Sequence, residues 1–143
     1  MYLEKTMTIS SAHILINNSS PCGRIHGHNW VITVGIEGEP LKNGMLINFT
    51  EIKEIVNRYD HVLILPGDNE HIKIHKLTMK VTINNEYEFP PRDCVFIPFS
   101  QVTAENLAKA IKQDISQYLY HINPTAKVSY IAVEETENNT VIL

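Results

Sequence analysis

Two histidines separated by a single glycine, His26 and His28, are the residues of this chain that most clearly suggest metal chemistry. Side chains of an extended strand alternate between its faces, so both imidazoles point to the same side. His13 lies near the end of the preceding strand, which we expect to pair with the His28 strand across the loop 17–24. Three imidazoles would then converge, and three nitrogen ligands with a fourth position open are typical of catalytic zinc. The alternative is a pair of surface histidines at a strand edge, with His13 unrelated to them.

A cysteine, Cys22, precedes His26 in the same loop. A thiol acts as a base or nucleophile only as the thiolate, and nearby positive charge lowers its pKa. Arg24 or a bound metal could supply that charge, which makes Cys22 the candidate reactive thiol. The other cysteine, Cys94, lies before an apolar run and is expected to be a packed thiol.

Two acidic positions could take part in the same chemistry. Asp60 directly precedes His61, and a carboxylate beside an imidazole can orient it and stabilise its protonated form. Taken alone, this dipeptide could equally be an inert pair at a helix end. Glu135 shares a strand face with Ile131 and Val133, and a carboxylate on an apolar face is either paired or binds something. A planar ligand with adjacent N–H donors would suit it, whereas the alternative is an exposed strand-end residue.

Composition narrows the class of protein. The chain has 143 residues, 43% of them hydrophobic, and a net charge of −4, which predicts one globular domain over residues 1–143. Its 12 Lys and Arg against 16 Asp and Glu argue against a nucleic-acid partner, and no apolar stretch is long enough for a membrane span. Two distant cysteines and the lack of a signal peptide predict a cytoplasmic protein. Three of the seven histidines are expected to be solvated: His71, His75 and His121.

The elements that must position these side chains suggest an α+β fold. Strands are predicted over 2–16, 28–36, 127–135 and 140–143. Asn48 and Glu51 form a capping box for one helix, whose apolar positions continue to Tyr59, and Thr103 is the N-cap of a second helix. An insertion at about 65–100 lies between them, and its alternating pattern around Asn84 predicts a hairpin. Both helices are expected to cover one face of the sheet.

Together these residues resemble the 6-pyruvoyl-tetrahydropterin synthase / 6-carboxy-tetrahydropterin synthase family. The matching segments occur in the family's order and cover nearly the whole chain apart from the insertion: Ala12-His13, Cys22–Asn29, Gly44–Phe49, Asp60-His61, Thr103–Asn106 and Glu135–Asn139. The resemblance implies the tunnelling fold (T-fold), an antiparallel four-stranded sheet with two helices on one face. It also implies assembly into barrels, usually as a homohexamer with active sites between subunits.

The resemblance also implies roles for individual residues. Zn²⁺ would be bound by the three histidines His13, His26 and His28. Cys22 would be the general base, coupled to Asp60 and His61. Glu135 would anchor the pterin ring or join the proton relay, while Thr103 and Glu105 match the segment that helps line the pterin pocket.

The family substrate is 7,8-dihydroneopterin triphosphate. The spacing between Cys22 and His26 matches the queuosine-pathway branch, whose products are 6-carboxy-5,6,7,8-tetrahydropterin, acetaldehyde and triphosphate. Two alternatives remain: a 6-pyruvoyl-tetrahydropterin synthase, which eliminates triphosphate, and a non-catalytic pterin-binding relative. The insertion is longer than in compact members of the family and resembles that of some archaeal relatives.

Overall fold

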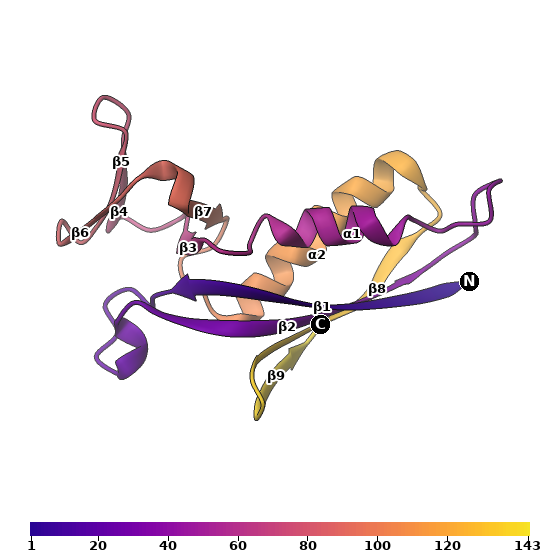
Figure 1. The fold of residues 1–143 in the computed structure, drawn as a ribbon, viewed down its shortest axis with the longest axis horizontal. Helices are drawn as coiled ribbons and strands as arrows, with labels where there is room; N and C mark the ends of the chain where they lie inside the picture. Colours follow the sequence, from indigo (N-terminus) through magenta and orange to yellow (C-terminus); the bar gives the residue numbers. More distant parts are fainter.

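The computed structural model describes residues 1–143 and contains two sheets and two α-helices (Figure 1). The strands are β1 (Tyr2–His13), β2 (His26–Glu37), β3 (Leu63–Pro66), β4 (Ile72–His75), β5 (Lys80–Ile83), β6 (Tyr87–Phe89), β7 (Cys94–Ile97), β8 (Lys127–Thr136) and β9 (Asn139–Ile142). The helices are α1 (Phe49–Asn57) and α2 (Ala104–Ile122). The main sheet has the order β7-β3-β1-β2-β8-β9, and a smaller sheet has the order β4-β5-β6. Both helices lie on one side of the main sheet, and the smaller sheet projects from the end at which β1 stops (Figure 1).

The two helices begin where the sequence predicts. The Asn48 side chain accepts from the first turn of α1, and the Glu51 side chain accepts from the Asn48 backbone, so the capping box is present. Thr103 caps α2 by accepting from the Asn106 N–H. Helix α1 ends earlier than the apolar spacing suggests. Tyr59 lies beyond it, yet the ring is only 1% exposed, so it belongs to the core without belonging to the helix.

A long antiparallel strand pair forms the centre of the main sheet. Strands β1 and β2 pair along their whole lengths, from Tyr2 opposite Glu37 to His13 opposite His26. The predicted strand 2–16 therefore ends at His13, and the predicted strand 28–36 already begins at His26. Because side chains alternate along β1, Ile9 and the other residues on its side of the strand are buried on the helix side, while the opposite face of the sheet stays open.

The predicted four-stranded antiparallel sheet is wrong in one respect, because the main sheet is mixed and has six strands. Strand β3 pairs parallel to β1 next to Ala12, and β7 pairs parallel to β3 from Leu63 opposite Cys94 onward. All four residues of β3 are buried, so it is a short apolar run without alternation. Parallel strands need a crossover connection, and the segment 67–93 supplies it. The expected insertion at about 65–100 thus contains strands of the main sheet at its ends.

The rest of the insertion is the smaller sheet, which adds β4 to the predicted hairpin. Val81 and Ile83 of β5 are fully buried, and they join Ile14, Leu63 and Leu65 in a second hydrophobic cluster. This cluster attaches the smaller sheet firmly to the end of the main sheet. None of the helices combines the length and the apolar character that crossing a membrane requires.

Candidate metal centre and active site

The three histidines converge at the end of the β1–β2 pair, on the face that the helices cover. His13 stands directly opposite His26, and the neighbouring pair is Ser11 opposite His28. One ligand atom of each imidazole lies within 4.8 Å of those of the other two. The Nε2 atoms of His13 and His28 are 3.1 Å apart, close to the ~3.3 Å that two nitrogen ligands of a tetrahedral Zn²⁺ ion require. The cluster expected from the sequence is therefore confirmed, and its donor set suits zinc.

Backbone carbonyls set the orientation of two of these rings. His13 Nδ1 donates to the Val102 carbonyl at 2.8 Å, and His26 Nδ1 donates to the Arg24 carbonyl at 2.7 Å. With the proton held on Nδ1, each Nε2 presents a lone pair, which is the arrangement found in metal-binding histidines. His13 is only 2% exposed. Burial lowers the pKa of His13, and the neighbouring histidines lower it further, whereas the hydrogen bond to the Val102 carbonyl acts in the opposite direction, and the resulting pKa is about 4. The ring is therefore neutral at pH 7.

Glu135 brings a carboxylate to the same point from β8. Its Oε1 atom lies 3.6 Å from His28 Nε2 and 3.7 Å from His13 Nε2. The residues two and four positions earlier, Val133 and Ile131, are fully buried on the helix side. A half-buried carboxylate next to three imidazoles favours a cation between them.

A cavity of about 470 Å³ opens beside the histidine cluster. Five of the sequence-predicted site residues line it: His13, Cys22, Thr103, Glu105 and Glu135. The cavity therefore combines a candidate metal ligand, an exposed thiol and two carboxylates, which is a set suited to proton transfer on a bound small molecule.

The Cys22 loop is folded back by specific local contacts. Cys22 lies in a short 3₁₀ turn, Pro21–Gly23, which Ser20 caps. The Cys22 carbonyl accepts from the Leu15 N–H at 2.9 Å, which ties the loop to the end of β1. A Cβ atom on Gly23 would lie 1.8 Å from the Asn18 carbonyl oxygen, so this close approach requires glycine. The thiol is thereby held exposed at the rim of the cavity.

Asp60 and His61 interact as expected, but His61 lines a different cleft. Asp60 Oδ2 is 2.9 Å from His61 Nδ1, and Asp60 Oδ1 accepts from the Ser10 N–H at 2.8 Å. The Ser10 N–H, followed by His61, lowers the pKa of Asp60, which keeps the carboxylate charged. The His61 side chain is 82% exposed, and the residue has a φ of 56°.

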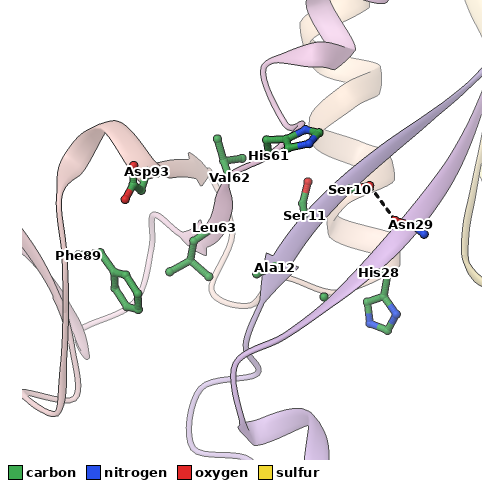
Figure 2. Close-up of a pocket in the computed structure, with 11 residues that line it drawn as sticks. Ser10, Ser11, Ala12, His28, Asn29, His61, Val62, Leu63, Phe89 and Asp93 are labelled. Carbon is green, nitrogen blue, oxygen red and sulfur yellow. Dashed lines mark hydrogen bonds between the residues drawn. The ribbon is translucent and has the colours of Figure 1, made fainter.

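This second cleft, of about 610 Å³, is lined by His61 together with Ser10, Asn29 and two residues of the insertion, Phe89 and Asp93 (Figure 2). Cys22 is absent from its lining, and His61 is absent from the lining of the first cavity. One chain therefore does not bring the thiol and the Asp60–His61 pair together.

Several supporting residues could not be found from the sequence. The Gln101 side chain donates to the Ile16 carbonyl and accepts from its N–H, which joins the end of β1 to the start of α2. Such contacts span 85 positions and leave no local pattern. Two of the histidines expected to be solvated also form side-chain hydrogen bonds, His71 with Asn17 and His75 with Thr82.

The fold places the chain in a known structural class. It superposes on a solved Plasmodium vivax 6-pyruvoyltetrahydropterin synthase with a TM-score of 0.73, at 24% identity, covering 100% of this chain and 97% of that one. The shared fold is the T-fold, built here on a curled mixed sheet with two helices.

The sequence comparisons identify the family. The model of the 6-pyruvoyl tetrahydropterin synthase family matches residues 2–143, and the chain belongs to this family. A Haemophilus influenzae 6-carboxy-5,6,7,8-tetrahydropterin synthase is 30% identical over 119 residues, which cover 76% of this chain and 77% of the relative. A Methanocaldococcus jannaschii protein, to which the same name is given provisionally, is 32% identical over 144 residues, which cover 94% of this chain and 86% of the relative.

Proposed function

We propose that this protein is a zinc-dependent lyase that converts 7,8-dihydroneopterin triphosphate to 6-carboxy-5,6,7,8-tetrahydropterin, acetaldehyde and triphosphate. Atom balance requires one water molecule. The observation that carries the proposal is the cavity in which His13, Cys22 and Glu135 meet. The names of the relatives favour this product over 6-pyruvoyl-tetrahydropterin.

The histidines provide the metal site of the proposed reaction. When bound by His13, His26 and His28, Zn²⁺ supplies Lewis acidity toward the side-chain hydroxyls of the substrate. The carbonyls of Val102 and Arg24 keep Nε2 of two of these ligands directed to the metal. Because His13 lines the cavity, a pterin bound there would direct its side-chain hydroxyls toward the histidine cluster.

Glu135 is proposed to anchor the pterin ring. A carboxylate can accept two parallel hydrogen bonds, and the pyrimidine edge of a pterin offers adjacent N–H donors. Thr103 and Glu105 line the same cavity at the start of α2. The pKa of Glu105 is lowered, chiefly by the Thr103 side chain, so this residue adds a second negative acceptor.

Cys22 is proposed as the general base, with the Asp60–His61 pair as the group that receives and returns the proton. Since one chain places these groups in separate clefts, the relay requires the His61 of a neighbouring copy to enter the cavity beside Cys22. This arrangement accounts for two properties of His61 together: its side chain is highly exposed, and Asp60 still holds its imidazole in one orientation.

A homohexamer is the proposed assembly, and the edges of the main sheet support it. On the side of β1 that faces away from β2, strand β3 pairs with it only at Ala12. The rest of that edge of β1, before Ala12, therefore has no strand partner within the chain. Strand β9, only four residues long, leaves the opposite edge of the sheet open. Two open edges on one sheet are suited to pairing between copies of the chain.

Product identification tests the proposal. Purified, zinc-loaded protein is incubated with 7,8-dihydroneopterin triphosphate, and the products are identified by mass spectrometry. We expect 6-carboxy-5,6,7,8-tetrahydropterin with an equal amount of acetaldehyde. Accumulation of 6-pyruvoyl-tetrahydropterin would assign the alternative lyase activity, and bound but unchanged pterin would indicate a non-catalytic binding protein.

A further inference from the structure

The only tryptophan of the chain lies directly against the histidine cluster. Trp30 follows His28 by two positions on β2, so the two side chains share a face, and it stands opposite Ile9 of β1. The residue is 0% exposed. No residue pattern in the sequence connects this indole with the metal site, and the proposed reaction assigns it no role.

The indole contacts two of the three imidazoles. Its centroid lies 5.0 Å from that of His13, with an interplanar angle of 76°, and 4.9 Å from that of His28, with an angle of 68°. Both distances and angles fit edge-to-face packing of aromatic rings. His13 belongs to one strand and His28 to the other, so a single rigid side chain supports ligands from both.

The choice of an indole carries a cost that another ring would avoid. The Trp30 Nε1–H is buried and has no hydrogen-bond acceptor. A buried N–H without a partner destabilises the folded state, and a phenylalanine ring would fill an apolar site without this penalty. The larger indole is therefore not explained by core packing alone. What it adds is simultaneous contact with both imidazole rings.

We propose that Trp30 is a positioning residue for the metal centre: its indole holds the His13 and His28 rings in the orientation that binds the ion. The inference rests on the proposed metal site. The backbone carbonyls of Val102 and Arg24 orient His13 and His26, whereas no such backbone bond orients His28. Packing on Trp30 supplies this restraint. Hydrogen-bonded partners of metal-binding histidines change metal affinity by about 10- to 100-fold when they are removed, and we expect loss of this packing contact to fall in the same range.

The test compares Trp30→Phe with Ile32→Val, a control on the same strand face that is equally buried but two residues further from the histidines. Zinc affinity is measured by competition with a chromogenic chelator, and stability of the metal-free protein is measured by urea unfolding. We expect zinc binding about 10- to 100-fold weaker in Trp30→Phe and unchanged in the control. A purely structural role would lower the stability of the metal-free protein and leave the zinc affinity as in wild type, which would overturn the inference.

Two further measurements keep the test decisive if the phenylalanine variant does not fold. Trp30→Tyr has the same six-membered ring as phenylalanine, extended by a hydroxyl group that fills more of the indole's space, and is expected to weaken zinc binding less. In the wild-type protein, the single indole N–H resonance and the tryptophan emission should both change on zinc addition and saturate at one equivalent. An indole that does not respond to zinc would contradict the proposal, whereas a wild-type chain that binds no zinc would contradict the proposed function as well.

Discussion

His13 and His26 stand directly opposite each other at the end of the β1–β2 pair, with ring centroids 4.4 Å apart. A slip of one residue in this pairing would move one ring to the other face of the sheet, so the strand register creates the histidine cluster of the proposed metal site. Neither residue needs a flexible loop to reach the other. The site is therefore expected to exist before metal binds.

His13→Ala should abolish stoichiometric zinc binding, because it removes the most buried of the three ligands. Metal analysis of the purified protein by plasma mass spectrometry measures this directly, with one zinc per chain expected for wild type. His121→Ala, which removes an exposed histidine at the end of α2, is the matched control and should retain its zinc. Full zinc content in His13→Ala would exclude this cluster as the metal site.

Cys22→Ser should lower kcat by about 10²- to 10⁴-fold, the range for loss of a general base. Zinc content and pterin affinity should stay near wild type, because the hydroxyl preserves the shape of the loop. Cys94→Ser serves as the second thiol variant. Burial raises the pKa of Cys94 to about 11, so this thiol is not a base at pH 7, and its loss should reduce stability without reducing the turnover of folded protein. Unchanged turnover in Cys22→Ser would remove the role assigned to it.

Mixing two inactive variants should restore activity if the relay crosses between copies. Cys22→Ala lacks the thiol and His61→Ala lacks the imidazole, and a mixed assembly contains some sites with both groups intact. We expect activity to appear after the two proteins are unfolded together and refolded, but not after either is refolded alone. Absence of recovery, with mixed assembly verified by native mass spectrometry, would place the relay within one chain or abolish it.

The metal-free protein should lose stability as the pH falls from about 6.5 to 4. His13 has a folded-state pKa of about 4 against an ordinary value of 6.5, so between these values the unfolded chain binds a proton that the folded chain does not. The loss is on the order of 3 kcal/mol and is complete below pH 4. Urea unfolding as a function of pH measures it. His13→Gln should show a shallower pH dependence, and an equally steep one would assign the effect to other groups.

The sequence was most informative where a local pattern fixes geometry. The spacing of His26 and His28 puts both rings on one strand face, and the capping residues Asn48 and Thr103 mark both helix starts. It was least informative for pairing between distant segments. Strand β3 is a four-residue apolar run, and nothing in such a run indicates that it pairs parallel to β1 or that β7 will join it.

The site shows the same division between local pattern and tertiary contact. Cys22 and Glu135 could be identified as candidates from the sequence because their residue types carry the chemistry. Their meeting with His13 in one cavity depends on how β8 and the 17–24 loop reach the end of β1. The indole of Trp30 is the clearest omission, since an aromatic residue in a strand is ordinarily part of the core.

The insertion should be attached through its own hydrophobic cluster and should be independent of the proposed metal site. Ile83 of β5 is fully buried in that cluster, so Ile83→Ala should cost about 2–5 kcal/mol of local stability. Hydrogen exchange should then accelerate in β4, β5 and β6, while the amides of β1 and β2 and the zinc affinity stay unchanged. Leu77→Ala, at a fully exposed position of the same insertion, should change neither the hydrogen exchange of these strands nor the zinc affinity. If Ile83→Ala weakens zinc binding as well, the two clusters are coupled and the insertion contributes to the site through Leu63 and its neighbours on β3.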